Sequence, residues 1–397
     1  IYADVVINHM TGGGSGTGSA GSSWDGGTLK YPGVPYGPDD FHGRDVCHTS
    51  DLKIHNYNDA NEVRYCRLVS LRDLRHSYQY VEDKIVSFLN KLIDWGVAGF
   101  RLDAAKHMFP NHIEKFNKRL NNLNSQWFPT NTKPFVFMEV IDLGGEAVSH
   151  KDYLSLGRIT EFKYGMHLGD VFRKNSGQRL AYLKNFGEDW NFMRGLSAVA
   201  FVDNHDNQRG HGAGGFNRIL TFFESHQYKM ATAFKLAWPY GYVRIMSSYY
   251  WDRNIQNGED KNDWVGPPSD SNGNTDDVKC FDNFVCEHRW RQVANMVKFH
   301  NVVSGTSVSN WWDNNGDAIA FGRGSKGFIV INNEKSTIDR EFSTGLPNGE
   351  YCDVITCENN RPPCGSNSSC RGSVTVSSGK VKIRVPNDSN PYFAIHV

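Results

Sequence analysis

The sequence predicts an α/β fold, a parallel sheet covered by helices, followed by a small antiparallel β domain. Strand-like and helix-like segments alternate along the first part of the chain. The strand-like runs there are apolar throughout, as in a sheet buried on both faces. After about Gly305 the runs become short and alternate with period two, which is typical of a β-sandwich. The length of 397 residues allows two or three domains.

The predicted elements follow one another from the first residue. Residues 81–95 carry apolar side chains at helical spacing, and Gly96 then ends the helix. Residues 11–43 are rich in Gly, Ser and Pro without a period, and this irregular excursion continues to about Asp73. The predicted strands are 1–9, 97–103, 135–140, 158–162, 198–206 and 242–246, the helices are 81–95, 112–123 and 228–237, and strands 327–331 and 380–385 belong to the last domain.

Several predicted strands end in Asp, Glu, His or Asn. In a (β/α)8 TIM barrel the carboxyl ends of the strands form the active-site face. A doubly wound sheet would also bind ligands there, but through a glycine-rich phosphate turn, and Gly12–Gly14 lacks that spacing. We therefore predict a barrel of residues 1–9 and 74–305, a loop domain of residues 10–73 inserted after the third barrel strand, and a C-terminal β-sandwich of residues 306–397.

Composition excludes some function classes. Lys plus Arg and Asp plus Glu both number 43, so no basic excess points to nucleic acid or an anionic membrane. No apolar run is long enough for a membrane helix. The 13% aromatic residues suit a carbohydrate binder or an ordinary core equally well. Eight cysteines without a CxxC pair favour disulfides and secretion, where the sequons at Asn367 and Asn387 would be glycosylation acceptors.

Three carboxylates stand at the ends of successive predicted strands: Asp103, Glu139 and Asp206. Cleavage of a glycosidic bond needs two carboxyl groups across the bond, one to attack or stabilise the sugar centre and one to protonate the leaving oxygen. Strand-end acids also cap the helices that follow them, and that interpretation competes for each acid alone. The three together favour a glycoside hydrolase.

Four segments share their order and separation with a known family. They read DVVINH at residues 4–9, FRLDAAKH at 100–107, MEVID at 138–142 and FVDNHDNQRGH at 201–211. These segments resemble the four conserved regions of the α-amylase family, most closely its animal-type, chloride-dependent members, and we expect an arthropod source. The resemblance implies retaining endo-hydrolysis of internal α-1,4-glucosidic bonds in starch, glycogen and maltooligosaccharides by a monomer.

The resemblance assigns roles by position. Asp103 would be the nucleophile, Glu139 the general acid and then base, and Asp206 the group that stabilises the transition state. Residues 211–215 resemble a loop that moves over the cleft, although an ordinary glycine-rich turn is the alternative. A structural role is the alternative for each histidine. The expected sugar contacts are His9, Tyr57, Arg101, Lys106, His107, Ile141, His205 and His211.

The resemblance also implies a chloride ion. Arg101 lies two residues before Asp103, so both side chains share one face of the strand, and a lone buried Arg is costly. A salt bridge to an acid is the alternative. By resemblance, Arg101, Asn204 and Arg244 would bind chloride, which offsets arginine charge near Glu139 and preserves its ability to donate a proton.

Calcium and four disulfides are the remaining implied features. The Asn8 side chain, Asp73 and the main-chain carbonyls of Arg64 and His107 would bind Ca²⁺, an ion that prefers several oxygen ligands. A solvated loop acid is the alternative for Asp73. The resemblance pairs Cys47 with Cys66, Cys280 with Cys286, and Cys352 with Cys364, which leaves Cys357 and Cys370 for each other.

Two rival functions and one gap accompany this interpretation. A catalytically inactive, binding or transporter-associated member usually lacks one of the three acids, and all three are present here. A related enzyme that transfers glucan chains or cuts other linkages is disfavoured by the animal-like motifs. The sequence begins inside an apolar run, and we predict only six of the eight strands of a barrel in it. We therefore expect an upstream segment, and expect these residues alone neither to fold stably nor to hydrolyse starch.

Overall fold

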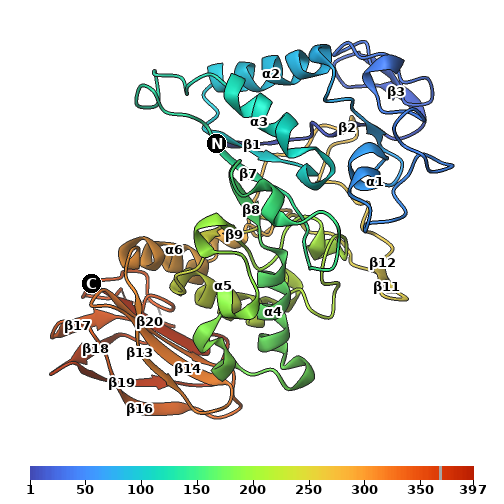
Figure 1. The fold of residues 1–397 in the computed structure, drawn as a ribbon. Helices are drawn as coiled ribbons and strands as arrows, with labels where there is room; N and C mark the ends of the chain where they lie inside the picture. Colours follow the sequence, from blue (N-terminus) through green and yellow to red (C-terminus); the bar gives the residue numbers. More distant parts are fainter. Residues whose placement is uncertain (366–368) are drawn as a thin grey trace. The chain divides into compact units, whose positions relative to one another are not determined.

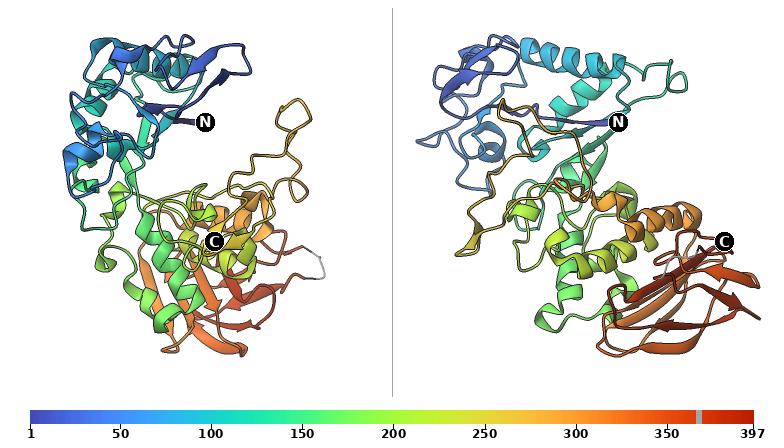
Figure 2. Two further views of the ribbon diagram at one scale, coloured as in Figure 1. Left: turned by 90° about the vertical axis from the view of Figure 1, so that its right-hand side faces the viewer. Right: turned by 180° about the vertical axis from the view of Figure 1, so that it is seen from behind.

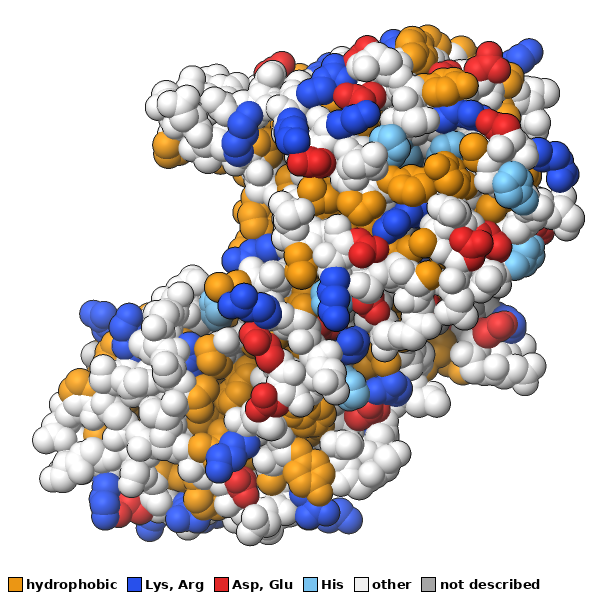
Figure 3. Space-filling view, in the orientation of Figure 1, with side chains coloured by type: hydrophobic (Ala, Val, Ile, Leu, Met, Phe, Trp, Pro, Cys, Tyr) orange, Lys and Arg blue, Asp and Glu red, His pale blue; other side chains and the backbone are white. Residues whose placement is uncertain are grey.

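The computed structural model describes residues 1–365 and 369–397, so the sequon at Asn367 lies outside the described residues (Figure 1). The chain forms two compact units. Unit 1 consists of Ile1–Glu161 and Ser197–Val199, and unit 2 of Phe162–Leu196 and Ala200–Val397. Within the described ranges no helix has both the length and the apolar character to cross a membrane. Acidic and basic side chains are interspersed on the face in Figure 3, as the zero net charge suggests.

Unit 1 is built on a parallel sheet, as predicted. Strands β1 (Tyr2–Val5), β6 (Gly99–Leu102), β7 (Phe135–Met138), β8 (Arg158–Thr160) and the start of β9 (Ala198–Ala200) pair in that order. The order of hydrogen-bonded strands continues to β10 (Tyr242–Val243). Helix α2 (Gln79–Asp94) precedes β6, and α3 (Pro110–Arg119) precedes β7. This alternation confirms the α/β class.

The strands are shorter than predicted, and this changes where Asp206 lies. Residues 198–206 are a strand only at β9, because the Asn204 side-chain oxygen accepts the backbone N–H groups of Asp206 and Asn207 at 3.2 and 2.8 Å. These bonds form a turn instead of a ladder. Asp206 therefore follows the strand by several residues, and β8 stands between β7 and β9. The prediction that the three acids end successive strands is wrong for Asp206.

Three helices escaped prediction, one of them within the irregular excursion described below. In α4 (Phe162–Arg173), glycines at 165 and 169 weaken the helical signal. Both are needed, because a Cβ at Gly165 would lie 2.3 Å from the Val202 carbonyl oxygen and one at Gly169 1.7 Å from that of Arg218. Helix α6 (Arg291–Val303) was also missed, whereas the predicted helix 228–237 is α5 (Ser225–Ala237).

The predicted excursion of residues 10–73 is mostly irregular. It contains the short helix α1 (Ala60–Tyr65), whose first turn is capped by the Asp59 carboxylate. Its ends are joined where β2 (His9–Met10) pairs antiparallel with β5 (Arg72–Asp73), so residue 9 leaves the first predicted strand. Its other strands are β3 (Ser15–Thr17) and β4 (Ser23–Asp25).

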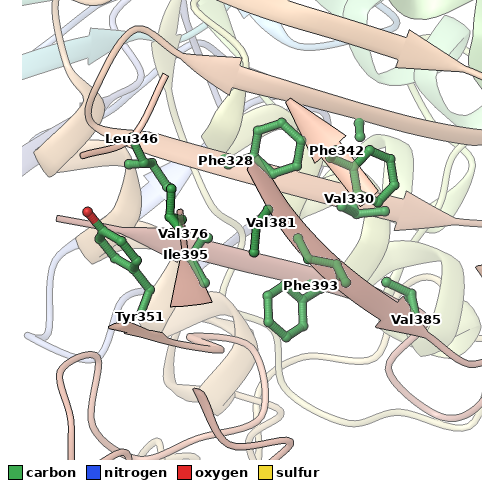
Figure 4. Close-up of a cluster of buried hydrophobic side chains, with 12 residues drawn as sticks. Phe328, Val330, Phe342, Leu346, Tyr351, Val376, Val381, Val385, Phe393 and Ile395 are labelled. Atoms are coloured by element: carbon green, nitrogen blue, oxygen red, sulfur yellow. The ribbon is translucent and has the colours of Figure 1, made fainter. Parts of the chain in front are cut away.

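Unit 2 ends in the predicted sandwich. Strands β13 (Val308–Asp313), β14 (Ala318–Arg323), β15 (Gly327–Asn332) and β20 (Tyr392–His396) form one antiparallel sheet. It faces the pairs β16 (Ile338–Ser343) with β19 (Lys380–Val385) and β17 (Gly349–Cys352) with β18 (Ser373–Val376) (Figure 2). Inward side chains such as Phe328, Val381 and Phe393 fill the core between the layers (Figure 4). The predicted division into three domains stays a prediction.

The remaining elements are short. Strands β11 (Ile255–Gln256) and β12 (Glu259–Asp260) form a hairpin in the yellow-to-gold segment of Figure 2. The 3₁₀ turns are η1 (Pro38–Asp40), η2 (Ala105–His107), η3 (His150–Tyr153), η4 (Asn175–Gly177), η5 (Leu180–Asn185), η6 (Glu188–Trp190), η7 (Gly195–Ser197), η8 (Asn207–Arg209), η9 (Phe222–Glu224) and η10 (Glu287–Arg289).

Asp353, fully buried in the C-terminal domain, should make stability depend on pH. Burial raises its pKa from 3.8 to about 6, although Thr356 and Arg371 oppose the shift. The folded state therefore binds a proton more tightly, and stability falls as pH rises from about 4 to 6. We expect a loss of up to about 3 kcal/mol across this window. In Asp353→Asn this component should be absent. Denaturant unfolding from pH 4 to 7 measures both, and identical pH profiles would contradict the prediction.

Candidate active site

Asp103 and Glu139 directly follow neighbouring strands of unit 1. Leu102 on β6 lies opposite Met138 on β7, so the residues after them emerge side by side. The Asp103 N–H donates to the Val5 carbonyl at 3.1 Å, and the Glu139 N–H to the Leu102 carbonyl at 2.9 Å. These backbone bonds fix both carboxylates at the carboxyl edge of the sheet.

One buried guanidinium contacts both carboxylates. Arg101 is only 3% exposed; its Nη1 donates to Asp103 Oδ1 at 2.9 Å, and its Nη2 lies 2.9 Å from Glu139 Oε1. Arg101 and Asp103 thus share one face, as predicted. Nη1 also donates to Asp4 Oδ1 at 2.7 Å. Sequence reasoning missed Asp4, although its place opposite Arg101 in the β1–β6 ladder was the available signal.

Ala104 ties the nucleophile segment to Glu139. Its backbone is left-handed, with φ 49° and ψ 32°, a conformation that costs a non-glycine residue roughly 1 kcal/mol. In this conformation the Ala104 N–H donates to Glu139 Oε2 at 2.9 Å. One oxygen of Glu139 is thus paired with the Arg101 guanidinium and the other accepts a backbone hydrogen bond, so the carboxyl group is held in one orientation.

Several predicted sugar contacts gather beside this pair in unit 1. Lys106 Nζ donates to the Ile141 carbonyl at 2.7 Å and lies 5.1 Å from the centre of the Tyr57 ring. It also pairs with Glu146, a residue that the sequence did not single out. His9 is partly buried, which lowers its pKa, and the charge of Asp103 partly offsets this effect.

The buried ring of His107 has a structural partner. It is 6% exposed, and its Nδ1 donates to the Val63 carbonyl at 3.0 Å. Burial lowers its pKa to about 4, so the ring is neutral at pH 7. This bond joins turn η2, which follows Asp103, to helix α1.

The Asp206 segment belongs to unit 2. His205 Nε2 lies 3.3 Å from Asp206 Oδ2, and both side chains are well exposed. The His211 N–H donates to the Asp206 carbonyl at 3.0 Å, so the turn brings these residues together. His211 Nε2 also lies 2.7 Å from Asp263 Oδ2. Gly210 and Gly212 both have positive φ, which accounts for two of the glycines here.

The residues expected to bind calcium fit that ion. Asn8 and Asp73 meet where β2 pairs with β5, and both are buried. In the part of the chain that the structure describes, Asn8 Oδ1 has no hydrogen-bond partner, although it is a ready cation ligand. Burial raises the pKa of Asp73 to about 6, although the hydrogen bond to His42 Nδ1 at 2.6 Å opposes the shift. In residues 1–365 and 369–397 no three His, Cys, Asp or Glu side chains form a metal cluster.

Comparison with known proteins identifies the family. Residues 309–396 match the family described as alpha amylase, C-terminal all-beta domain. The chain is 52% identical to an alpha-amylase of Oryzias latipes over an alignment of 408 positions, which covers all of this chain and 78% of that protein. The chain belongs to the α-amylase family. It is also 50% identical to a pancreatic alpha-amylase of Homo sapiens over 407 residues, again with 78% of that protein covered.

Solved structures of the α-amylase family agree. Wild-type alpha-amylase I of Eisenia fetida superposes with a TM-score of 0.98 at 62% identity, covering all of this chain and 81% of that one. A mutant of the same enzyme, solved with maltohexaose, gives the same values. The relatives are animal α-amylases, and they do not establish the predicted arthropod source.

The four disulfides expected of an α-amylase of this type are confirmed. They are Cys47–Cys66 in unit 1 and Cys280–Cys286, Cys352–Cys364 and Cys357–Cys370 in unit 2.

The residues expected to bind chloride are divided between the units, with Arg101 in unit 1 and Asn204 and Arg244 in unit 2. Among the described residues, the buried Nε of Arg101 has no hydrogen-bond partner, whereas Nη2 lies 2.9 Å from Glu139 Oε1. A buried donor without a partner fits an anion.

Proposed function

We propose that this α-amylase cleaves internal α-1,4 bonds of starch, glycogen and maltooligosaccharides with retention of anomeric configuration. The observation that carries the proposal is the pair of strand-end carboxylates, Asp103 and Glu139, bridged by Arg101 in a chain 50–62% identical to animal α-amylases. Secretion is supported by the four disulfides and by the pancreatic relatives.

In the proposed mechanism Asp103 attacks the anomeric carbon while Glu139 protonates the leaving oxygen. A glycosyl–Asp103 ester forms and the shortened glucan leaves. Glu139 then removes a proton from water, which attacks the same carbon and releases Asp103. Arg101 donates a hydrogen bond that orients Asp103 for attack, and the Ala104 N–H orients Glu139. Asp206 would stabilise the positively charged transition state.

A direct test is starch hydrolysis by the full-length natural protein, followed by viscosity and by the anomer released. Rapid loss of viscosity with release of the α-anomer supports retaining endo-hydrolysis. Slow loss of viscosity with early release of small sugars would contradict endo-cleavage, and β-anomer would contradict retention. A folded protein that binds starch without cleaving it would favour the binding-subunit alternative.

Calcium should stabilise unit 1. Asn8 and Asp73 would hold the ion together with the Arg64 and His107 carbonyls, and the bound ion would join the excursion to the segment after Asp103. Removing it with a chelator leaves Asp73 buried without its cation, so we expect thermal unfolding at a temperature lower by about 10 °C or more. Added Ca²⁺ should restore the midpoint. In Asn8→Ala the chelator should have much less effect, and an equal effect in both proteins would contradict the site.

Chloride should activate the enzyme. A bound chloride would offset the positive charge near Glu139 and so keep this residue competent as an acid. We expect kcat for starch to rise at least about tenfold between chloride-free buffer and saturating chloride. Arg244→Gln should change this halide response. An unchanged response in an otherwise active Arg244→Gln variant would discard the assignment of Arg101, Asn204 and Arg244.

A further inference from the structure

Arg209 in unit 2 connects two segments that are distant in sequence. It ends turn η8, three residues after Asp206, and its N–H donates to the Asp206 carbonyl at 2.9 Å. Its side chain is 8% exposed although it carries a full charge. Burying an arginine carries a desolvation cost that its contacts must offset, so those contacts indicate the role of the residue.

Those partners all belong to residues 249–265. The guanidinium lies 4.1 Å from the centre of the Trp251 ring and 5.1 Å from that of Tyr249. Its Nη1 donates to the carbonyl oxygens of Asp263 and, at 3.0 Å, Val265. Among the described residues, Nη2 of Arg209 has no hydrogen-bond partner. Arg209 is therefore held against this segment by ring stacking and by hydrogen bonds to two main-chain carbonyls.

The segment that Arg209 contacts is itself held together by hydrogen bonds. Trp251 Nε1 donates to Asp260 Oδ2 at 2.8 Å, and Asp260 Oδ1 accepts the N–H groups of Asn254 and Asn262 at 2.8 and 3.0 Å. The Asp260 carboxylate thus organises the β11–β12 hairpin against the ring on which Arg209 lies.

A second contact between the turn and this segment is exposed and weaker. His211 Nε2 pairs with Asp263 Oδ2, but these side chains are 57% and 32% exposed, and such pairs contribute little. A cavity of about 410 Å³ lies between these two contacts, and it is lined by Arg209, His211 and hairpin residues including Lys261. Trp264, 77% exposed, follows Asp263. Of these two contacts with the turn, the one through Arg209 is therefore the more buried.

We propose that Arg209 is a positioning residue that holds residues 255–265 on the turn bearing Asp206 and His211, and so sets glucan affinity more than the rate of bond cleavage. Arg209 reaches the Asp206 segment only through its backbone, so the acid itself is left in place. A preordered hairpin spares a bound glucan the entropic cost of fixing it. This inference rests on the proposed function.

The test compares Arg209→Lys with wild type and with Arg340→Lys in the full-length protein. Lysine keeps the charge but loses the planar stack and the fork. Arg340 is a matched control, stacked 4.5 Å from the Trp312 ring in the sandwich. For maltoheptaose, we expect Arg209→Lys to raise KM about tenfold with kcat within about threefold, and hydrogen exchange to increase across residues 255–265. Arg340→Lys should match wild type in both measurements.

Two outcomes would overturn the inference: an unchanged KM, whatever the change in kcat, or an equal change in Arg340→Lys. Trp251→Phe, which loses the bond to Asp260, is the second variant if Arg209→Lys does not fold, and it should show the same rise in KM. Wild-type protein that fails to cleave maltoheptaose would instead refute the proposed function. The two failures are therefore distinguishable.

Discussion

Replacing Asp103 by Asn is expected to reduce starch hydrolysis by at least about 10⁴-fold, because the amide cannot form the glycosyl ester. The fold should survive, since the amide oxygen can still accept the hydrogen bond from Arg101 Nη1. Single-turnover and steady-state assays would measure the loss. Retention of a tenth of wild-type activity would remove Asp103 from the nucleophile role.

A second variant separates the two carboxylates by their chemistry. Glu139→Gln should lose about 10²–10⁴-fold on starch, the usual contribution of a general acid. A maltosyl fluoride needs no protonation of its leaving group, so Glu139→Gln should form the intermediate from it at a near-normal rate, whereas Asp103→Asn should not. Asp4→Asn is the matched control, because Asp4 contacts the same Arg101 Nη1 and is expected to have no chemical role. Rescue of Asp103→Asn by the fluoride would reverse the assignments.

Arg101→Met should be the most destabilising single substitution at this site. Three carboxylates, Asp4, Asp103 and Glu139, lie within 2.9 Å of the Arg101 guanidinium. Methionine fills similar volume but leaves these acids without their cation, and breaking a buried ion pair in this way typically costs about 3–5 kcal/mol. We expect a corresponding loss in the free energy of unfolding, together with loss of activity.

Denaturant unfolding at pH 7 checks this prediction. The control is Lys118→Met, which breaks the exposed pair with Glu114 on α3 and should cost no more than about 0.5 kcal/mol. If Arg101→Met is as stable as the control, the three contacts make no net contribution to the free energy of unfolding. The charge of Arg101 would then act only in binding the substrate or the anion.

The sequence predicted the site where local pattern and chemistry coincide. Asp103 and Glu139 follow strands whose apolar runs are unmistakable, and the family motifs around them assign their roles. The turn after β9 could not be predicted, because Asn204 bonds to the backbone through its side chain and ends the strand early. Helix α4 was hidden because close backbone contacts require its glycines. Arg209 carries no local signal, since its partners lie 40 to 56 residues away.

The complete pairing of the eight cysteines makes this protein a convenient background for single-thiol labelling. A cysteine introduced at Asn217, an exposed position just beyond the glycine-rich loop, would be the sole unpaired cysteine among residues 1–397. A fluorophore or spin label attached there would report directly on whether residues 211–215 change position as glucan binds. The expected motion could thus be followed in solution without removing any of these eight cysteines.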